Sequence, residues 1–339
     1  MMPKALVLYS GSLASKVALR LAQRVPGLEL RVIYFRSPFF SDPEDHGRRM
    51  CPPGEGVALS TKTLKREYLR IALGGDGLPF PCGACRWVLL SRAARLLRRA
   101  RLDFVVTGEV LGKGGLGSEE LARLDREVGL TGRVVRPLSG RLLPRTQAEE
   151  LGHWPGEGLY DLTSEEPDRL EELARKLAVS PGVESWERCT LSNPKYLERL
   201  KRILREGLPT VNTLRLLRFK HFFYFPPDLK VVVALDPEEQ AELQTLFLPQ
   251  DVRIYFSIPR SPLVLARADW SGRGETARQA AVLSVAQLAL GLAGFPAGEP
   301  CELCFRFEWE EETRRLGVTS HVPAEADLLP AQAEVYLTS

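Results

Sequence analysis

Four of the six cysteines fall into two CxxC pairs, Cys82 with Cys85 and Cys301 with Cys304. Two thiols at this spacing can ligate a metal ion or exchange sulfur and electrons with each other. A chain of 339 residues is long enough to stabilise itself with a hydrophobic core. We therefore expect metal or redox chemistry rather than a disulfide framework.

The second pair is the weaker candidate. Cys301 and Cys304 lie far from the first pair along the chain, outside the spacing of a zinc ribbon. They fall in an apparent strand, where positions i and i+3 face opposite sides. We interpret them as a chance pair, with a separate zinc site as the alternative. We expect Cys51 to be unpaired and to lie in a loop.

The polar run from Ser10 to Ser15 (SGSLAS) could bind phosphate. It separates the apolar run 5–9 from a helical pattern over 15–24. In a parallel sheet, the loop between a strand and its helix directs backbone N–H groups and the helix N-terminus at an anion. An ordinary tight turn is the alternative.

These side chains need elements that bring strand ends together. The runs 5–9, 15–24 and 28–35 read as strand, helix and strand, which predicts a parallel sheet covered by helices. Further strands are expected at 103–107 and 132–135, and further helices at 62–73, 85–101, 118–128, 165–178 and from 193 onward. Near residue 210, short β-like runs begin, with helices from 236 and over 275–292. We predict an α/β parallel-sheet domain (1–150), a helical extension (151–210) and a smaller α+β domain (211–339).

The loop at Ser10 resembles the SGGxDS fingerprint of the PP-loop ATP pyrophosphatase superfamily. Ser10, Gly11 and Ser15 match, whereas Ser12 replaces the second glycine and Ala14 replaces the aspartate. The resemblance implies a Rossmann-like fold that binds ATP and releases pyrophosphate. An alanine cannot coordinate Mg²⁺, so the metal used by the family lacks one of its ligands here.

Four further segments resemble the branch of this superfamily that puts sulfur into tRNA. They are similar, in order, to the family's NPCxxC, TGEVLG, RPLS…LLP and GGCLLTDP elements, and they are residues 81–86, 104–112, 136–144 and 188–194. Order and spacing agree over roughly residues 3–205. The chain departs from the family at Lys113-Gly114-Gly115, where relatives have Gln-Arg-Pro, and in the missing glycines before Cys189.

The resemblance implies ATP-dependent thiolation of a tRNA uridine, in which the base is adenylated and sulfur then displaces AMP. The implied ATP-binding residues are Ser10, Gly11, Ser12, Ser15, Phe35, Thr107, Gly108 and Glu109. The implied catalytic thiols are Cys82, Cys85 and Cys189, which hold a [4Fe–4S] cluster with one open iron or relay a persulfide. Buried small residues without chemistry are the alternative. We expect Arg86 and the helix start to favour thiolate at Cys85.

Basic side chains line two expected helices next to these cysteines. Such faces would hold a polyanion such as tRNA, and a solvated arginine-rich surface is the alternative. The predicted RNA-binding residues are Arg86, Arg92, Arg95, Arg99, Lys195, Arg199 and Arg202. From about residue 215 the chain also resembles, loosely, the NFACT-R type of RNA-binding module. This implies RNA contacts by Lys220 and His221, with a half-buried strand as the alternative.

The composition is that of a globular protein, with 44% hydrophobic and 26% charged residues and a net charge of +3. We find neither a membrane-span pattern nor a signal peptide and expect a cytoplasmic protein. The expected partners are tRNA and a sulfur donor, and a homodimer is compatible with the sequence. Two other functions stay open: a non-catalytic RNA- or nucleotide-binding partner subunit descended from a tRNA sulfurtransferase, and an ATP pyrophosphatase acting on a small molecule.

Overall fold

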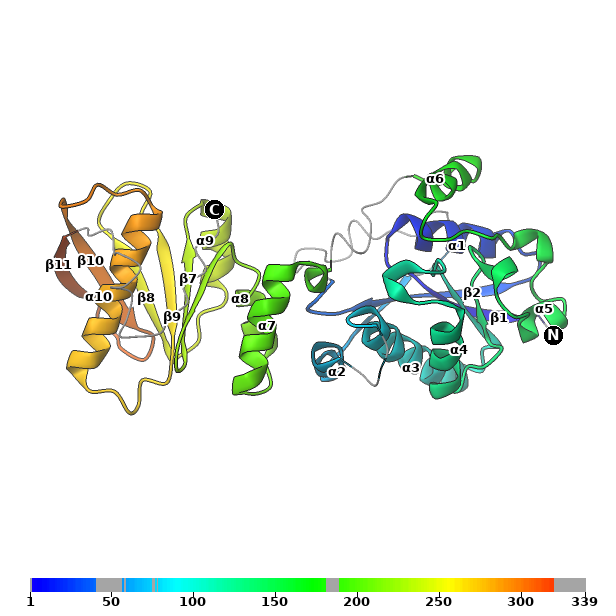
Figure 1. The fold of residues 1–339 in the computed structure, drawn as a ribbon, viewed down its shortest axis with the longest axis horizontal. Coiled ribbons are helices and arrows are strands. Elements are labelled where there is room, and N and C mark those ends of the chain that lie inside the picture. The colour runs from blue at the N-terminus through cyan, green and yellow to red at the C-terminus, as the bar shows by residue number, and fades with distance from the viewer. Residues whose placement is uncertain are drawn as a thin grey trace. The chain divides into compact units, whose positions relative to one another are not determined.

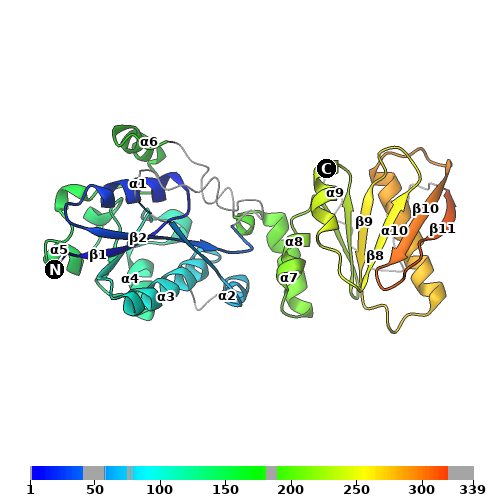
Figure 2. The same cartoon turned by 180° about the vertical axis from the view of Figure 1, so that it is seen from behind.

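The computed structural model describes residues 2–40, 57, 59–74, 77, 79–180 and 189–319. The chain forms two compact units, Met1–Pro209 and Thr210–Ser339. Each unit has its own sheet and its own hydrophobic core (Figures 1 and 2). The predicted loop position of Cys51 lies outside the described residues.

The first unit is built on a five-stranded sheet in the order β3-β2-β1-β4-β5, with all pairings parallel. The strands are β1 (Lys4–Leu8), β2 (Glu29–Arg36), β3 (Leu59–Thr63), β4 (Phe104–Thr107) and β5 (Val134–Val135). The side chains of β4 are all buried, as expected for a parallel sheet with helices on both faces. In such a sheet the carboxyl ends of β1, β2 and β4 meet at one edge, where ligands bind.

Helices cover both faces of this sheet (Figure 1). On one side α1 (Leu13–Gln23) packs with α6 (Pro167–Lys176), and on the other α3 (Cys82–Ala100) packs with α4 (Ser118–Glu127) and α2 (Glu67–Leu73). The short helix α5 (Gln147–Glu150) and the helix α7 (Pro194–Glu206) complete the unit. Asn193 caps α7 by accepting hydrogen bonds from the amides of Lys195 and Tyr196.

The predicted helix over 62–73 is wrong in its first part. Lys62 and Thr63 belong to β3, where Lys62 pairs with Phe35 of β2, and α2 begins only at Glu67. β3 is an edge strand of mostly exposed Ser, Thr and Lys side chains, so it lacks the apolar alternation that marks a strand in sequence. The predicted helix at 85–101 begins earlier than expected, at Cys82.

The second unit is a six-stranded sheet in the order β11-β10-β8-β9-β7-β6, with all pairings antiparallel. The strands are β6 (His221–Phe225), β7 (Leu229–Ala234), β8 (Asp251–Phe256), β9 (Leu263–Arg267), β10 (Pro300–Phe307) and β11 (Arg314–Thr319). The long helix α10 (Glu275–Leu292) packs on this sheet, and α8 (Val211–Leu216) and α9 (Pro237–Gln244) are shorter. The predicted fold class, a parallel-sheet α/β domain followed by a smaller α+β domain, is confirmed.

A buried ion pair joins β8 to β9 in this unit. The guanidinium of Arg267 donates to both carboxylate oxygens of Asp251 at 2.7 Å and to the side-chain oxygen of Asn212 at 2.8 Å. Because Asn212 belongs to α8, its hydrogen bond with Arg267 fixes this helix to the sheet. In the part of the chain that the structure describes, we find no helix with both the length and the apolar character of a membrane span.

Candidate functional site

The loop between β1 and α1 is closed by its own serines. Ser12 caps α1, because its Oγ accepts a hydrogen bond from the amide of Ser15 at 3.3 Å. The Ser15 hydroxyl donates to the carbonyl of Ser12 at 2.9 Å and accepts from the amide of Ser10 at 3.2 Å. Gly11 adopts a φ of +79°, in the left-handed region that favours glycine. The hydroxyls therefore shape the loop, since they are bonded within it.

Backbone donors of this loop have no acceptor of their own. In the described residues, no hydrogen bond is formed by the amides of Gly11, Leu13 and Ala14. The amides of a helix's first turn need an outside partner, and the helix dipole favours an anion there. The loop is buried, with Ala14 only 3% exposed. It therefore fits a phosphate held by backbone N–H groups, without a carboxylate at position 14.

Gly108, directly after β4, packs against this loop. A Cβ added at Gly108 would lie 2.6 Å from the amide nitrogen of Ser15 and 2.7 Å from the carbonyl carbon of Ala14. No side chain fits this space, so the end of β4 and the loop after β1 are in direct contact. Phe35, the predicted neighbour of adenine, is buried near the carboxyl end of β2, the strand beside β1.

Glu109, the next residue, is buried and binds two arginines. Its Oε2 accepts hydrogen bonds from Nε of Arg136 at 2.6 Å and from the hydroxyl of Thr107 at 3.1 Å. Its Oε1 lies 2.8 Å from Nε of Arg86. Arg136 also donates to both carboxylate oxygens of Asp125 at 2.8 Å. Both oxygens of Glu109 are thus engaged, and neither is available to replace the missing loop aspartate.

The charge state of Glu109 follows from this network. Burial alone would raise the pKa of its carboxyl, but Arg136 and Arg86 lower the pKa below its ordinary value. Glu109 is therefore ionised at neutral pH and anchors both guanidinium groups. The Nε of Arg86 is buried and forms no hydrogen bond with the described residues, although it is ion-paired. The carboxylate of Glu109 therefore compensates the charge of this buried group.

The three cysteines grouped by the sequence lie in one neighbourhood. Cys82 and Cys85 occupy the first turn of α3, and Cys189 precedes the short 3-10 turn Thr190–Ser192. The amide of Thr190 donates to the carbonyl of Phe39 at 2.8 Å, which joins this segment to the residues that follow β2. Burial raises the pKa of Cys85 to about 12, and Cys189 and Cys82 add to the increase as potential thiolates. A thiolate at Cys82 or Cys189 would therefore disfavour a thiolate at Cys85.

The expected thiolate at Cys85 is wrong for the described state. Burial outweighs the cation of Arg86, which lowers the pKa of this thiol but is itself paired with Glu109. Burial also raises the pKa of Cys189. Both thiols are therefore protonated at neutral pH, and they become nucleophiles only when a ligand, a cation or water changes their surroundings.

A glycine turn rests on the sulfur of Cys82. A Cβ added at Gly114 would lie 2.6 Å from this Sγ, and Gly114 has a φ of +70°. Gly112 and Gly115 on either side also have positive φ. This is the segment where the chain departs from the family's Gln-Arg-Pro run. The structure gives the departure a reason, because glycine leaves the space that the thiol occupies.

The placement of the three cysteines bears on whether they could ligate a cluster. Among the described residues, no three His, Cys, Asp or Glu side chains converge as a group that could hold a metal ion. As placed, Cys82, Cys85 and Cys189 therefore do not fit a [4Fe–4S] site, and no described carboxylate set fits Mg²⁺. The [4Fe–4S] cluster and Mg²⁺ both stay predictions.

Two of the predicted RNA-binding residues are already in ion pairs. Arg86 is paired with Glu109, and Nη2 of Arg92 lies 2.8 Å from a carboxylate oxygen of Glu67. The exposed members of the set are Arg95, Arg99, Lys195 and Lys220. The half-buried members are Arg199, Arg202 and His221. Contact with RNA stays a prediction for all of them.

The second CxxC pair lies in a strand, as predicted. Cys301 and Cys304 belong to β10 and pair with Val318 and Arg315 of β11. Cys304 is buried and Cys301 is half-buried. Within the described residues neither belongs to a group that could hold a metal. Their chemical role stays a prediction.

Two members of the buried charge network were not predicted. Arg136 was noted only as part of the RPLS element, and Asp125 was not singled out. A signal was present, because Asp125 stands beside Leu124 on the apolar side of an amphipathic helix that includes Leu121. A charged residue in such a position usually has a buried partner.

Comparisons with known proteins add little to these observations. No family model matches the chain, and no curated protein matches it. One similar solved structure is a predicted subunit of a tRNA methyltransferase from Methanocaldococcus jannaschii, with 16% identity over 53% of this chain and 90% of that chain, and a TM-score of 0.30. Another is the U34-tRNA thiolase NcsA from Methanococcus maripaludis with its [4Fe–4S] cluster, with 14% identity over 60% of this chain and 66% of that chain, and a TM-score of 0.33. With TM-scores this low, the two similarities carry no argument about the chemistry of the site.

Proposed function

We propose that this protein replaces an oxygen of a tRNA uridine with sulfur and uses ATP to activate the base. One observation carries the proposal: the segment Thr107–Glu109 contacts both halves of the site. Gly108 packs on the loop of Ala14 and Ser15, and Glu109 pairs with Arg86 beside the thiols. A phosphate-binding loop and a set of thiols are therefore joined through three consecutive residues.

The activation step uses the loop. The unpaired amides of Gly11, Leu13 and Ala14 would hold the phosphates of ATP while the uridine carbonyl oxygen attacks the α-phosphorus. Pyrophosphate leaves, and the base carries AMP on that oxygen.

The sulfur step uses the cysteines. A sulfur donor of the persulfide class first leaves a Cys–S–SH on one thiol. The terminal sulfur attacks the activated carbon, and AMP leaves with the electron pair of the broken C–O bond. A second cysteine then attacks the inner sulfur, which forms a disulfide and releases the thiolated base. An external dithiol restores the two thiols.

A second function is favoured by a specific observation. The loop has Ala14 in place of an acid, and Glu109 has both oxygens engaged, so we find no described carboxylate free to hold Mg²⁺ beside the loop. Metal-assisted adenylation would then be slow. The corresponding alternative is a non-catalytic subunit that binds RNA or nucleotide and assists another enzyme.

Pyrophosphate release separates these possibilities. The full-length chain is incubated with ATP, Mg²⁺ and bulk tRNA, and pyrophosphate is measured. Release that requires tRNA is expected, and the Cys85→Ser variant should keep it, because activation precedes sulfur transfer. Release without tRNA would indicate a small-molecule substrate. Binding of tRNA without any release would indicate the non-catalytic subunit and contradict the proposal.

The cluster route is tested by metal analysis. The full-length chain is purified without oxygen, and its iron, sulfide and zinc contents are measured. We expect no stoichiometric iron if the thiols act as a persulfide relay. About four irons per chain, lost in Cys82→Ser and kept in Cys301→Ser, would show a cluster and overturn the relay. Cys301 is the matched control because it is also a half-buried thiol of a CxxC pair.

A further inference from the structure

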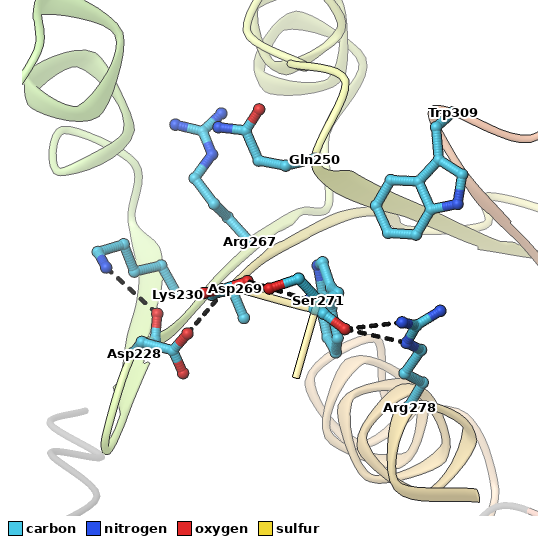
Figure 3. Close-up of a pocket in the computed structure, with 10 residues that line it drawn as sticks. Asp228, Lys230, Gln250, Arg267, Asp269, Ser271, Arg278 and Trp309 are labelled. Atoms are coloured by element: carbon cyan, nitrogen blue, oxygen red, sulfur yellow. Dashed lines mark hydrogen bonds between the residues drawn. The ribbon is translucent and has the colours of Figure 1, made fainter. Parts of the chain in front are cut away.

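The second unit contains a pocket of about 700 Å³ that the proposed function does not use. Its lining includes three aromatic or amide side chains, Trp270, Trp309 and Gln250, and three cationic ones, Lys230, Arg267 and Arg278. Figure 3 shows Trp309, Gln250, Lys230 and Arg278 arranged around the opening. Neither Lys220 nor His221 lines it. The pocket is therefore a different place from the RNA contact predicted in this unit.

Trp309 offers a flat apolar surface at the mouth of the pocket. Its side chain is 46% exposed, which is unusual for a tryptophan in a folded unit. The ring rests on Phe307, with centroids 4.6 Å apart and planes tilted by 35°. The contact with Phe307 holds the indole in place. Its exposed surface is therefore available for a flat ligand to stack on.

Trp270 supplies a donor without a partner. It is only 3% exposed, and its Nε1–H forms no hydrogen bond with the described residues. Its ring packs edge-on against Phe307 at 5.6 Å, and its carbonyl accepts two hydrogen bonds from Arg278, at 3.1 and 2.8 Å. The residue is thus firmly fixed while its donor stays unpaired. Because this nitrogen is enclosed by protein atoms, Trp270 contributes a rigid wall of the pocket rather than a hydrogen bond to a ligand.

The remaining polar groups suit a heterocycle with a phosphate. Gln250 is exposed, and its amide offers both a donor and an acceptor. Lys230 and Arg278 are cationic, and a third cation of the lining, Arg267, is already paired with Asp251. The carboxylate of Asp269 also lines the pocket and accepts hydrogen bonds from the amide and the hydroxyl of Ser271. The nearby carboxylate of Asp228 is already used, because it accepts from the amide of Asp269 at 2.6 Å and pairs with Arg273. A flat ring with hydrogen-bonding edges and a negative backbone matches this set.

We propose that this pocket binds an unpaired base of an RNA strand, with the base stacked on Trp309. The choice of RNA rests on the proposed function, whereas stacking and hydrogen bonding rest on the pocket alone. Gln250 contacts the edge of the base, and Lys230 lies toward the phosphate. Stacking on an aromatic side chain tolerates any base, so the pocket adds affinity for single-stranded RNA rather than strong sequence preference.

The test measures binding of a short labelled oligouridylate to the full-length chain by fluorescence anisotropy. Trp309→Ala should weaken binding about 5- to 100-fold, the range found when one stacking side chain is removed. Trp309→Phe should restore part of the affinity, and Gln250→Ala should cause a smaller loss. Tyr255→Ala is the matched control, since Tyr255 is an exposed aromatic residue of the same unit that does not line the pocket.

Three outcomes overturn the inference: no binding of the oligouridylate, unchanged affinity in Trp309→Ala, or equal loss in Tyr255→Ala. Free uridine monophosphate is a further arm, and binding as tight as that of the oligouridylate would assign the pocket to a mononucleotide instead. The measurement needs no ATP and no sulfur. Stacking on Trp309 can therefore hold when thiolation fails, and it can fail when thiolation holds.

Discussion

At the scale of single residues, the proposed chemistry depends on thiols that the fold keeps protonated. Cys85 is half-buried, and its desolvation raises the pKa of its thiol to about 12, close to the ion pair of Arg86 and Glu109. A protonated thiol is a poor nucleophile and resists oxidation. The site would therefore be inactive until a substrate or sulfur donor enters.

The reactivity of Cys85 should report this raised pKa. A raised pKa means that the folded chain keeps the proton after an unfolded chain has lost it. Alkylation of Cys85 should therefore be slow at pH 8 and rise about tenfold per pH unit to pH 10 without a plateau. In denaturant the alkylation rate of the same thiol should reach a plateau above pH 9. Peptide mass spectrometry after timed alkylation measures both, and a plateau below pH 9 in the native chain would contradict the burial argument.

Gly114 should be required for the position of the Cys82 sulfur. Gly114→Ala adds a methyl group 2.6 Å from Sγ at a φ of +70°, whereas Gly129→Ala adds one at a φ of +71° with nothing within 4 Å. Both should lose about 1–2 kcal/mol from the left-handed backbone, measured by chemical denaturation. Gly114→Ala should lose more and also impair sulfur transfer. Equal stability and equal activity in the two variants would show that the turn does not support Cys82.

At the scale of elements, the buried charge network joins β4, α3 and α4 to the segment after β5. Arg136 bridges Glu109 and Asp125, and Glu109 continues to Arg86 on α3. These contacts fix the segment Thr107–Glu109, which touches the loop Ser10–Ser15. The network therefore has a positioning role in addition to its contribution to stability.

Removing the central cation should destabilise the first unit strongly. Arg136→Met leaves Glu109 and Asp125 buried without their partner, and breaking such a group costs about 3–5 kcal/mol in unfolding free energy. Arg169→Met, which breaks exposed pairs with Asp161 and Glu166, should change stability little. Denaturant titration compares the two. A loss in Arg136→Met no larger than in Arg169→Met would contradict the buried network.

The sequence predicted elements with an apolar pattern and missed those without one. The run before Ser10 and the run before Gly108 are buried on both faces and were found as strands. The edge strand β3 has exposed Ser, Thr and Lys side chains, and its parallel pairing with β2 depends on a distant part of the chain. The strand β11 (Arg314–Thr319) lies at the other sheet's edge, begins with two arginines and contains a glycine, and was likewise not predicted.

The site was only partly predictable from sequence, for a related reason. Loop and cysteine positions are local motifs, so Gly11 and Cys85 could be named in advance. The ionisation of Cys85 could not, because it depends on burial and on the pairing of Arg86 with Glu109, which are properties of the folded unit. The pocket at Trp309 is formed by segments far apart in the sequence and has no motif.

At the scale of the whole molecule, two units with separate cores would serve one RNA substrate. The first unit has exposed basic residues on α3 and α7, including Arg95, Arg99 and Lys195. The second unit has the stacking pocket. Phosphate contacts give sequence-independent affinity that falls with salt, whereas stacking is much less sensitive to it.

Binding of tRNA should therefore show a salt dependence that α3 controls. Replacing Arg95 and Arg99 together by Ala should weaken binding and reduce the slope of log affinity against log salt by about 1–2, since each lost phosphate contact removes nearly one unit. The control removes two other exposed arginines, Arg126 on α4 and Arg175 on α6. An equal change in both double variants would mean that α3 is an ordinary solvated surface.

Detection of a thiolated nucleoside tests the central claim most directly. Unmodified tRNA is incubated with the full-length chain, ATP, Mg²⁺, a persulfide donor and a dithiol, then digested and examined by mass spectrometry. We predict a uridine with one oxygen replaced by sulfur, formed only with ATP, absent in Cys85→Ser and present in Cys301→Ser. Pyrophosphate release by wild type and Cys85→Ser in parallel samples verifies that activation took place. Activated tRNA without any thiolated uridine in the wild type, or equal yields in the two variants, would contradict the account.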